Sequence, residues 1–262
     1  MLSIEINGLP AEVEDVHRVA TWNYGHFTSM QVREGAVPGL ELHLRRLAGA
    51  SLELFGEAAE QDDVRIRALI RHGLGDRSDA SVRVSVVPAV GSAGRTDVMV
   101  SVSDAVADSP RPALRVRTAT YERDLPHLKH VATMGLTYGR LQAREAGFDD
   151  VLFVGRDGFV REGSVWNASF WDGEQVLWPE APVLPGITMQ LLQAGLTRIG
   201  AMWSTRRLTV DDFPALRAAA ANNSHCPSQP LASIDQFVFS DEGSVLTDVL
   251  NRAWASVPWD VI

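Results

Sequence analysis

The chain has 262 residues, a formal net charge of −9 and an apolar fraction of 45%. This length allows one large domain or two modest ones, each with a hydrophobic core. The acidic balance disfavours a broad surface for nucleic acid or for anionic membranes. No apolar run is long enough to cross a bilayer, and the first residues lack the basic and apolar segments of a signal peptide. The single cysteine, Cys226, excludes an internal disulfide and a cysteine-based metal cluster, so we expect a cytoplasmic protein without a metal site.

The first 105 residues predict an N-terminal α+β domain. Two short strands are expected on either side of a turn signal at Asn7-Gly8. Leucines at helical spacing predict a helix over Leu40–Phe55, which Gly56 would end, and a second helix covers Gln61 to His72. The further strands expected in this part lie at His26 to Arg33, Ser81 to Val86 and Val98 to Val102.

Residues 106–113 contain two prolines among small residues, which is typical of a linker between domains. Residues 114–262 would then form a C-terminal domain. Its expected strands are Leu114 to Thr120, Asp150 to Val154, Phe159 to Arg161 and Val165 to Trp171. Its expected helices are Gly135 to Ala146, a segment after Pro185, Asp211 to Ala219 and Ser244 to Ala255. Strands and helices are mixed without strict alternation, which indicates an α+β fold rather than a doubly wound sheet.

Lys129 is the only lysine of the chain, whereas the other 23 basic residues are arginines. Arginine can replace lysine for surface charge, but its guanidinium does not deprotonate and cannot form a Schiff base. A single retained lysine therefore indicates a site that needs an amine nucleophile. The alternative is that a bias towards arginine left one lysine by chance, and the residues around Lys129 decide between the two interpretations.

Three further segments carry groups suited to an anionic cofactor. Glu162-Gly163-Ser164-Val165-Trp166-Asn167 lies where one expected strand turns into the next. Leu184-Pro185-Gly186-Ile187-Thr188 opens a helix, and free N–H groups at a helix start, next to a glycine, form a cup for an anion. Arg45 and Arg46 lie on the early helix, and a guanidinium can grip a phosphate with two hydrogen bonds.

These segments, in this order and spacing, resemble the class IV, fold-type IV pyridoxal-phosphate enzymes, which include branched-chain aminotransferases and aminodeoxychorismate lyases. The resemblance covers nearly the whole chain. It implies a small N-terminal α/β sandwich domain, a larger C-terminal pseudo-barrel domain, a homodimer and pyridoxal 5'-phosphate (PLP) as cofactor. The segments that carry it are Gly25-His26-Phe27, His43 to Leu47, Leu128-Lys129-His130, Glu162 to Asn167, Leu184 to Thr188, Asn223-Ser224 and Pro230.

The resemblance also implies a role for each matching residue. Lys129 would hold PLP as an aldimine and move the α-proton of the substrate. Glu162 would pair with the pyridine nitrogen and keep it protonated. The residues that would bind the phosphate or complete its cup are Arg46, Gly186, Ile187, Thr188, Asn223 and Ser224. Arg45 would be a solvated or interface charge, and Asn167 would shape the turn near Glu162 rather than touch the substrate.

The sequence departs from the family pattern where the family builds its substrate pocket. Asn23-Tyr24-Gly25 stands where Gly-Asp-Gly is usual, Gln31 replaces a basic residue, and Ala132 replaces an asparagine. His225 and Cys226 follow Ser224, where small or aliphatic residues are usual. The candidate substrate contacts are Tyr24, His26, Thr28, Gln31, Arg115 and His225, and for each the competing interpretation is an ordinary packed or solvated residue.

The sequence leaves three functions open. An aminotransferase would move an amino group between an amino acid and a 2-oxo acid, and this is the function we expect. A lyase of the 4-amino-4-deoxychorismate type would use the same proton abstraction but eliminate pyruvate. A PLP-binding protein without turnover is the third, and the presence of Lys129, Glu162 and Arg46 argues against it.

Overall fold

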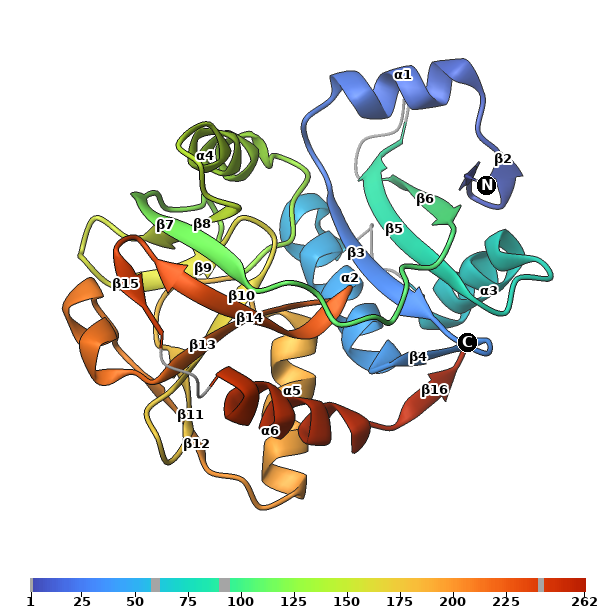
Figure 1. Ribbon diagram of the computed structural model, residues 1–262. Coiled ribbons are helices and arrows are strands. Elements are labelled where there is room, and N and C mark those ends of the chain that lie inside the picture. The colour runs from blue at the N-terminus through green and yellow to red at the C-terminus, as the bar shows by residue number, and fades with distance from the viewer. Residues whose placement is uncertain (1, 58–61, 90–94, 240–242) are drawn as a thin grey trace. The chain divides into compact units, whose positions relative to one another are not determined.

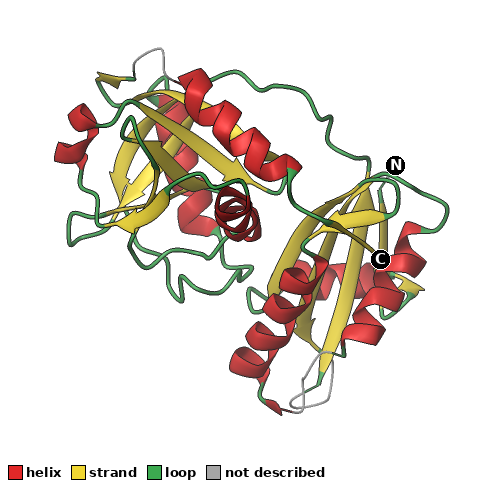
Figure 2. Cartoon of the chain, turned by 90° about the horizontal axis from the view of Figure 1, so that it is seen from below, coloured by secondary structure: helices red, strands yellow, loops and turns green. Residues whose placement is uncertain are grey.

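The computed structural model describes residues 2–57, 62–89, 95–239 and 243–262, which form two compact units. Unit 1 contains Met1–Ala107, Leu128–Ala132 and Pro258–Ile262, and unit 2 contains Asp108–His127 and Thr133–Val257. These units differ from two continuous domains, because the short segment that carries Lys129 belongs to unit 1. Figure 2 shows helices and strands mixed within each unit, which confirms the α+β class.

Unit 1 is built on a five-stranded antiparallel sheet in the order β2-β1-β6-β5-β3 (Figure 1). The Asn7-Gly8 turn joins the first two strands, and both of its residues have positive φ, 53° and 84°, as a tight hairpin turn requires. A two-stranded sheet of β4 and β16 completes the unit. The strands are β1 Ser3–Ile6, β2 Leu9–Pro10, β3 His26–Val32, β4 Ala36–Pro38, β5 Ala80–Pro88, β6 Thr96–Ser103 and β16 Trp259–Val261.

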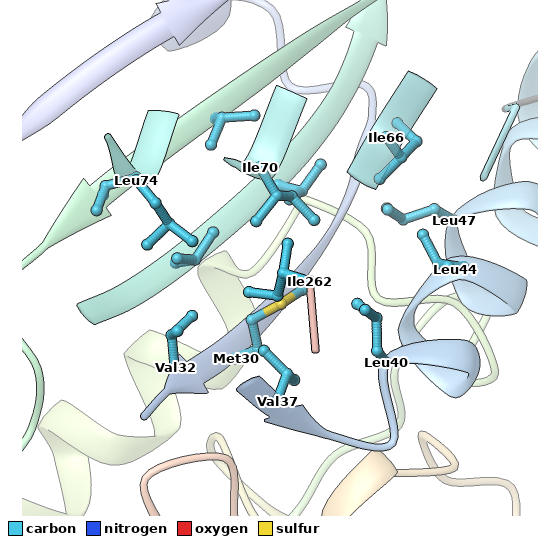
Figure 3. Close-up of a cluster of buried hydrophobic side chains, with 14 of the residues drawn as sticks. Met30, Val32, Val37, Leu40, Leu44, Leu47, Ile66, Ile70, Leu74 and Ile262 are labelled. Atoms are coloured by element: carbon cyan, nitrogen blue, oxygen red, sulfur yellow. The ribbon is translucent and has the colours of Figure 1, made fainter. Parts of the chain in front are cut away.

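Two helices, α2 (Leu40–Phe55) and α3 (Asp63–Leu74), cover one face of the five-stranded sheet. The expected helix over Leu40–Phe55 is confirmed to the residue, with Gly56 after its end at a φ of 82°. Figure 3 shows side chains of α2, α3 and β3 meeting Ile262 in one buried cluster. A further helix, α1 (Val13–Thr21), has no buried residue, and it was not among the elements expected from the sequence.

The other face of this sheet is polar. Because side chains alternate along a strand, the residues between the buried valines of β5 lie on the face away from α2 and α3. Across β3, β5 and β6 this face carries eight polar residues, Ser29, Gln31, Ser81, Arg83, Ser85, Asp97, Ser101 and Ser103, and three apolar ones, Phe27, Val87 and Met99, and we call it the polar face. It is the face of the sheet on which polar side chains of unit 1 could bind a ligand.

Unit 2 is built on a curled nine-stranded sheet in the order β12-β11-β10-β13-β14-β7-β8-β9, with β15 paired to β14. Its inner face encloses a core that includes Phe170, Phe213 and Ala221. The strands are β7 Leu114–Thr120, β8 Asp150–Val154, β9 Val160–Gly163, β10 Asn167–Trp171, β11 Val176–Pro179, β12 Trp203–Arg206, β13 Ala218–Asn223, β14 Cys226–Ile234 and β15 Phe237–Val238.

Three helices pack on this sheet. α5 (Ile187–Arg198) and α6 (Gly243–Ala255) cover the face opposite the inner core. They approach so closely that a Cβ on Gly195 would overlap the carbonyl oxygen of Ala253. α4 (Met134–Glu145) packs on β8 through Leu136 and Ala143. In the part of the chain that is described, no helix is long and apolar enough to span a membrane.

The expected helix over Asp211 to Ala219 is wrong. Val210–Ala215 is a 3₁₀ helix, and Ala218–Asn223 is the central strand β13. A run of four alanines favours a helix locally, but here it lies between β10 and β14. Small side chains suit this position because both faces of β13 are covered by packed side chains.

We expect Leu44→Ala to lower the free energy of unfolding of unit 1 by about 2–5 kcal/mol, because it removes a fully buried side chain and leaves a cavity. Leu52→Ala is the matched control on the same helix, since Leu52 is 52% exposed, and its cost should stay within about 0.5 kcal/mol. Urea unfolding followed by circular dichroism measures both. Equal costs for the two variants would contradict the packing of α2.

Candidate active site

Main-chain hydrogen bonds attach the Lys129 segment to the free edge of β3. The N–H of Phe27 donates to the carbonyl of Lys129 over 2.9 Å, and the N–H of Val131 donates to the carbonyl of Gly25 over 3.0 Å. His26 and His130 face each other between these bonds as an antiparallel pair. In this antiparallel register the next opposed pair is Phe27 and Lys129. Opposed residues share a face, so Lys129 lies on the polar face together with Phe27.

The side chain of Lys129 lies near an aromatic ring that an arginine also approaches. Its Nζ is 5.0 Å from the centroid of the Phe27 ring, and the guanidinium carbon of Arg83 is 3.5 Å from the same centroid. Arg83 also donates from Nε to Ser85 Oγ over 3.2 Å. One ring thus has both cations near it, which places an amine and an anion-binding guanidinium on one surface.

Two buried histidines, His26 of β3 and His43 of α2, lie between this strand and this helix, on the opposite side of the sheet. His43 Nδ1 and Thr28 Oγ1 are 2.6 Å apart, and His26 Nε2 and Ser51 Oγ are 2.9 Å apart. Burial, followed by the positive charges of Arg46 and Lys129, lowers the pKa of His43 from 6.5 to about 3. Burial lowers the pKa of His26 to about 4. Both rings are therefore neutral at pH 7.

The substrate contacts expected in unit 1 have different surroundings. His26 and Thr28 are 0% exposed and are bonded to α2, which favours their interpretation as packed residues. Tyr24 is 42% exposed and donates to the carbonyl of Leu54. Gln31 lies on the polar face, where its amide bonds to Ser81 Oγ over 2.8 Å.

Two further expected contacts belong to unit 2 and lie on its surface. Arg115 donates to the carbonyl of Gly147 over 2.5 Å, and its side chain is 60% exposed. His225 is exposed, and its N–H donates to Asn223 Oδ1. Arg45, expected to be a solvated charge, is 68% exposed and pairs with Glu41 over 3.5 Å.

Glu162 is a buried carboxylate with a cationic neighbour. It is 6% exposed, and its Oε1 lies 3.7 Å from a terminal nitrogen of Arg123, whose side chain is also 6% exposed. The same oxygen accepts the N–H of Leu184 over 3.3 Å. The carboxylate thus has a guanidinium nearby and one N–H donor. Glu162 can therefore serve as an acceptor for a protonated ring nitrogen.

The start of α5 offers main-chain donors. Gly186 is the residue before the helix, and no side chain of the described residues caps it. Ile187 and Thr188, the first two helical residues, are 6% and 5% exposed. First-turn amides and the helix dipole together favour an anion at such a place.

Asn223 and Ser224 form the turn between β13 and β14. Asn223 Oδ1 accepts the N–H groups of His225 and Cys226 over 2.9 and 3.1 Å. Its side chain therefore shapes the turn, and Ser224 at the tip is partly exposed. Among the described residues, no group of histidines, cysteines and carboxylates is arranged to hold a metal ion.

Two residues of interest, Arg83 and Arg123, were not expected from the sequence. A signal existed for Arg83, because the alternation of Ser81 to Val86 places it on the face opposite to the valines. Arg123 lies in a loop six residues before Lys129, and nothing in the local pattern distinguishes it from a solvated arginine.

Residues 25–234 match the family described as amino-transferase class IV. The match covers most of the chain, which therefore belongs to this family, as the motifs predicted. Among curated proteins, the branched-chain-amino-acid aminotransferase-like protein 2 of Arabidopsis thaliana is 25% identical over 134 residues. That match covers 49% of this chain and 24% of the relative, so the matched stretch spans about a quarter of the relative's length.

Several solved structures share the fold. The fold IV-transaminase CpuTA1 from Curtobacterium pusillum has a TM-score of 0.81 at 20% identity, covering 98% of this chain and 100% of that chain. The T.th. branched-chain amino acid aminotransferase complexed with N-(5'-phosphopyridoxyl)-L-glutamate has a TM-score of 0.84 at 17% identity, covering 98% and 95%. A hypothetical aminotransferase from Mycobacterium tuberculosis, in a PLP-bound form, has a TM-score of 0.79 at 21% identity, covering 97% and 99%.

The buried His43 predicts a pH-dependent stability. Its pKa is about 3 in the folded protein and near 6.5 in the unfolded chain, so the unfolded chain takes up a proton first as the pH falls. The stability contributed by the neutral ring is present above pH 6.5 and is lost progressively towards pH 3. Between pH 7.5 and 5 this loss is on the order of 2 kcal/mol.

His43→Gln should remove this share of the pH dependence. Exposed His17 supplies the control, because His17→Gln should retain the pH dependence of the wild type. Urea unfolding at pH 7.5 and pH 5 measures the difference for each protein. An unchanged difference in His43→Gln would show that His43 is not buried as a neutral ring.

Proposed function

We propose that this protein is a PLP-dependent aminotransferase that moves an amino group between an amino acid and a 2-oxo acid. The observation that carries the proposal is the placement of the sole lysine. Main-chain pairing holds Lys129 on the polar face of unit 1, near the Phe27 ring that Arg83 also approaches, in a chain of the class IV aminotransferase family.

The chemistry of the available groups fits PLP. PLP has an aldehyde that reacts with an amine, a phosphate that needs cations and N–H donors, and a pyridine nitrogen that pairs with a carboxylate. The candidate groups for these three parts are the Lys129 amine, the Arg46 guanidinium with the start of α5, and the buried Glu162 carboxylate.

PLP supplies, when bound, an electron sink for the electron pair released when the Cα–H bond of the substrate breaks. Lys129 would hold the cofactor through Nζ and then carry the proton that leaves Cα. Glu162, with Arg123 beside it, would accept a hydrogen bond from the ring nitrogen and keep that nitrogen protonated. Arg46 and the amides of Ile187 and Thr188 would hold the phosphate.

Arg83 is the group we infer to bind the substrate carboxylate. It lies on the same face as Lys129, and its planar guanidinium offers a two-pronged grip on a carboxylate. Gln31 stands where the family pattern has a basic residue, but its neutral amide donates to Ser81 Oγ. The names of structural neighbours agree with this substrate class, since the T.th. enzyme was solved with a phosphopyridoxyl glutamate and the Mycobacterium tuberculosis protein with alpha-ketoglutarate.

A screen of amino donors against the PLP-loaded protein tests this function. We expect at least one amino acid to abolish the visible absorbance of bound PLP and to yield the corresponding 2-oxo acid. Release of pyruvate and 4-aminobenzoate from aminodeoxychorismate, with no donor active, would replace the aminotransferase by a lyase. No reaction in either assay would leave a PLP-binding protein without turnover.

Arg46 and Arg45 provide a matched pair for the phosphate. Arg46→Ala should weaken PLP binding by about ten- to a hundredfold, because a charge-assisted hydrogen bond contributes about 1.5–3 kcal/mol. Arg45→Ala, which removes an exposed charge paired with Glu41, should leave PLP binding unchanged. Equilibrium dialysis measures both dissociation constants, and equal values would remove Arg46 from the phosphate site.

A homodimer and a cytoplasmic location belong to the same proposal. Sedimentation of the active protein tests the first, and a stable active monomer at working concentration would exclude the homodimer.

A further inference from the structure

Leu184 is held at both of its peptide groups. Its N–H donates to Glu162 Oε1 over 3.3 Å, and its carbonyl accepts from Asn167 Nδ2 over 2.8 Å. Leu184, Glu162 and Asn167 are each 6% exposed. Because a well-packed residue with both ends bonded has little freedom to move, these two bonds fix the path of the chain just before α5.

The same Asn167 side chain also packs against the residue that opens α5. A Cβ on Gly186 would overlap Asn167 Oδ1, and its next neighbour would be Asn167 Cγ at 3.1 Å. The two ends of one amide group therefore face two different parts of the loop. Nδ2 faces the carbonyl of Leu184, and Oδ1 faces Gly186.

Asn167 lies in a place that packing alone would fill with an apolar residue. It belongs to the face of the sheet that α5 and α6 cover, where Ala218, Ala220 and Trp178 form part of a core. Directly opposite Asn167 is Asn222, 1% exposed, whose amide has no hydrogen-bond partner among the described residues. A buried amide costs free energy unless it is hydrogen-bonded. The bond from Asn167 to the carbonyl of Leu184 offsets this cost for Asn167. An apolar side chain would fill the same place without needing such a bond.

We propose that Asn167 is a positioning residue that couples the two cofactor-binding features of unit 2, the Glu162 carboxylate and the start of α5. This inference rests on the proposed PLP function. Asn167 does not touch the cofactor in this proposal. It acts through Leu184, whose N–H orients the Glu162 carboxylate, and through Gly186, whose position sets the direction of the first-turn amides of α5.

The proposal separates Asn167 from the residues that act at one end of PLP. Glu162→Gln should disturb the ring end only, and Arg46→Ala the phosphate end only. Asn167→Ala should disturb both ends at once. Pyridoxal, which lacks the phosphate, distinguishes the ends, because misplacement of the α5 amides reduces the preference for PLP over pyridoxal.

The first experiment measures the dissociation constants of PLP and pyridoxal, and the pH dependence of the visible absorbance of bound PLP. We expect Asn167→Ala to reduce the preference for PLP over pyridoxal by about tenfold, the change expected for one lost hydrogen-bonded contact. We also expect it to shift the pH midpoint of the absorbance. Ser169→Ala is the control, since Ser169 is buried two residues further along β10 and bonds to the carbonyl of Ala220 instead.

A second experiment needs no cofactor. Hydrogen exchange of residues 183–190 in the PLP-free protein should increase in Asn167→Ala and in the near-isosteric Asn167→Asp, which cannot donate to the carbonyl of Leu184 when it is ionised. Exchange should stay unchanged in Ser169→Ala. Gly186→Ala should also disturb this loop, and Asn167→Ala should relieve that disturbance, because it removes the atoms that a Cβ at position 186 would meet.

The outcomes keep the two proposals apart. A wild-type protein that binds no PLP, with exchange still increased in Asn167→Ala, would overturn the proposed function and support the loop-positioning role. Normal PLP binding by the wild type, with both the PLP preference and the exchange unchanged in Asn167→Ala, would overturn the role of Asn167 and leave the proposed function in place.

Discussion

Two main-chain hydrogen bonds, from Phe27 to Lys129 and from Val131 to Gly25, determine where the chemistry of unit 1 lies. They extend the sheet beyond β3 by a short segment that comes from a distant part of the chain. Because side chains alternate, a slip of one residue in this pairing would move Lys129 from the polar face to the face covered by α2. Backbone register thus sets the face of the sheet on which the amine lies.

Gly25 makes this pairing possible. Its φ is +155°, and a Cβ at this residue would lie 2.7 Å from the carbonyl oxygen of Val86. Any side chain would push the start of β3 away from β5 and would disturb the edge to which the Lys129 segment binds. A residue that has no side chain therefore lies immediately before β3, next to the residues that place the lysine.

The two faces of the sheet of unit 1 carry different functional groups. On the helix-covered side, His26 and His43 are buried, neutral and bonded to hydroxyl groups. On the other side, the cations Lys129 and Arg83 lie near the Phe27 ring. In unit 2 the carboxylate of Glu162 is buried beside Arg123.

Much of this could be predicted from the sequence, and the failures have identifiable physical causes. Leucine spacing and Gly56 located α2, because a helix that buries one face shows its period directly. The predicted helix over Asp211 to Ala219 ran into β13, since local propensity favours alanine in helices and only the neighbouring strands make Ala218 and Ala219 part of a strand. His26 and Thr28 remained candidate substrate contacts, because alternation separates the two faces of a strand without showing which face the helices cover.

The central claim is that Lys129 carries the cofactor, and the rarity of lysine makes it directly measurable. Borohydride reduction of the PLP-loaded protein, followed by peptide mass analysis, should place the reduced adduct on the peptide that contains Lys129, since no other lysine exists in the chain. Cofactor-loaded protein in which this peptide stays unmodified after reduction would contradict the account.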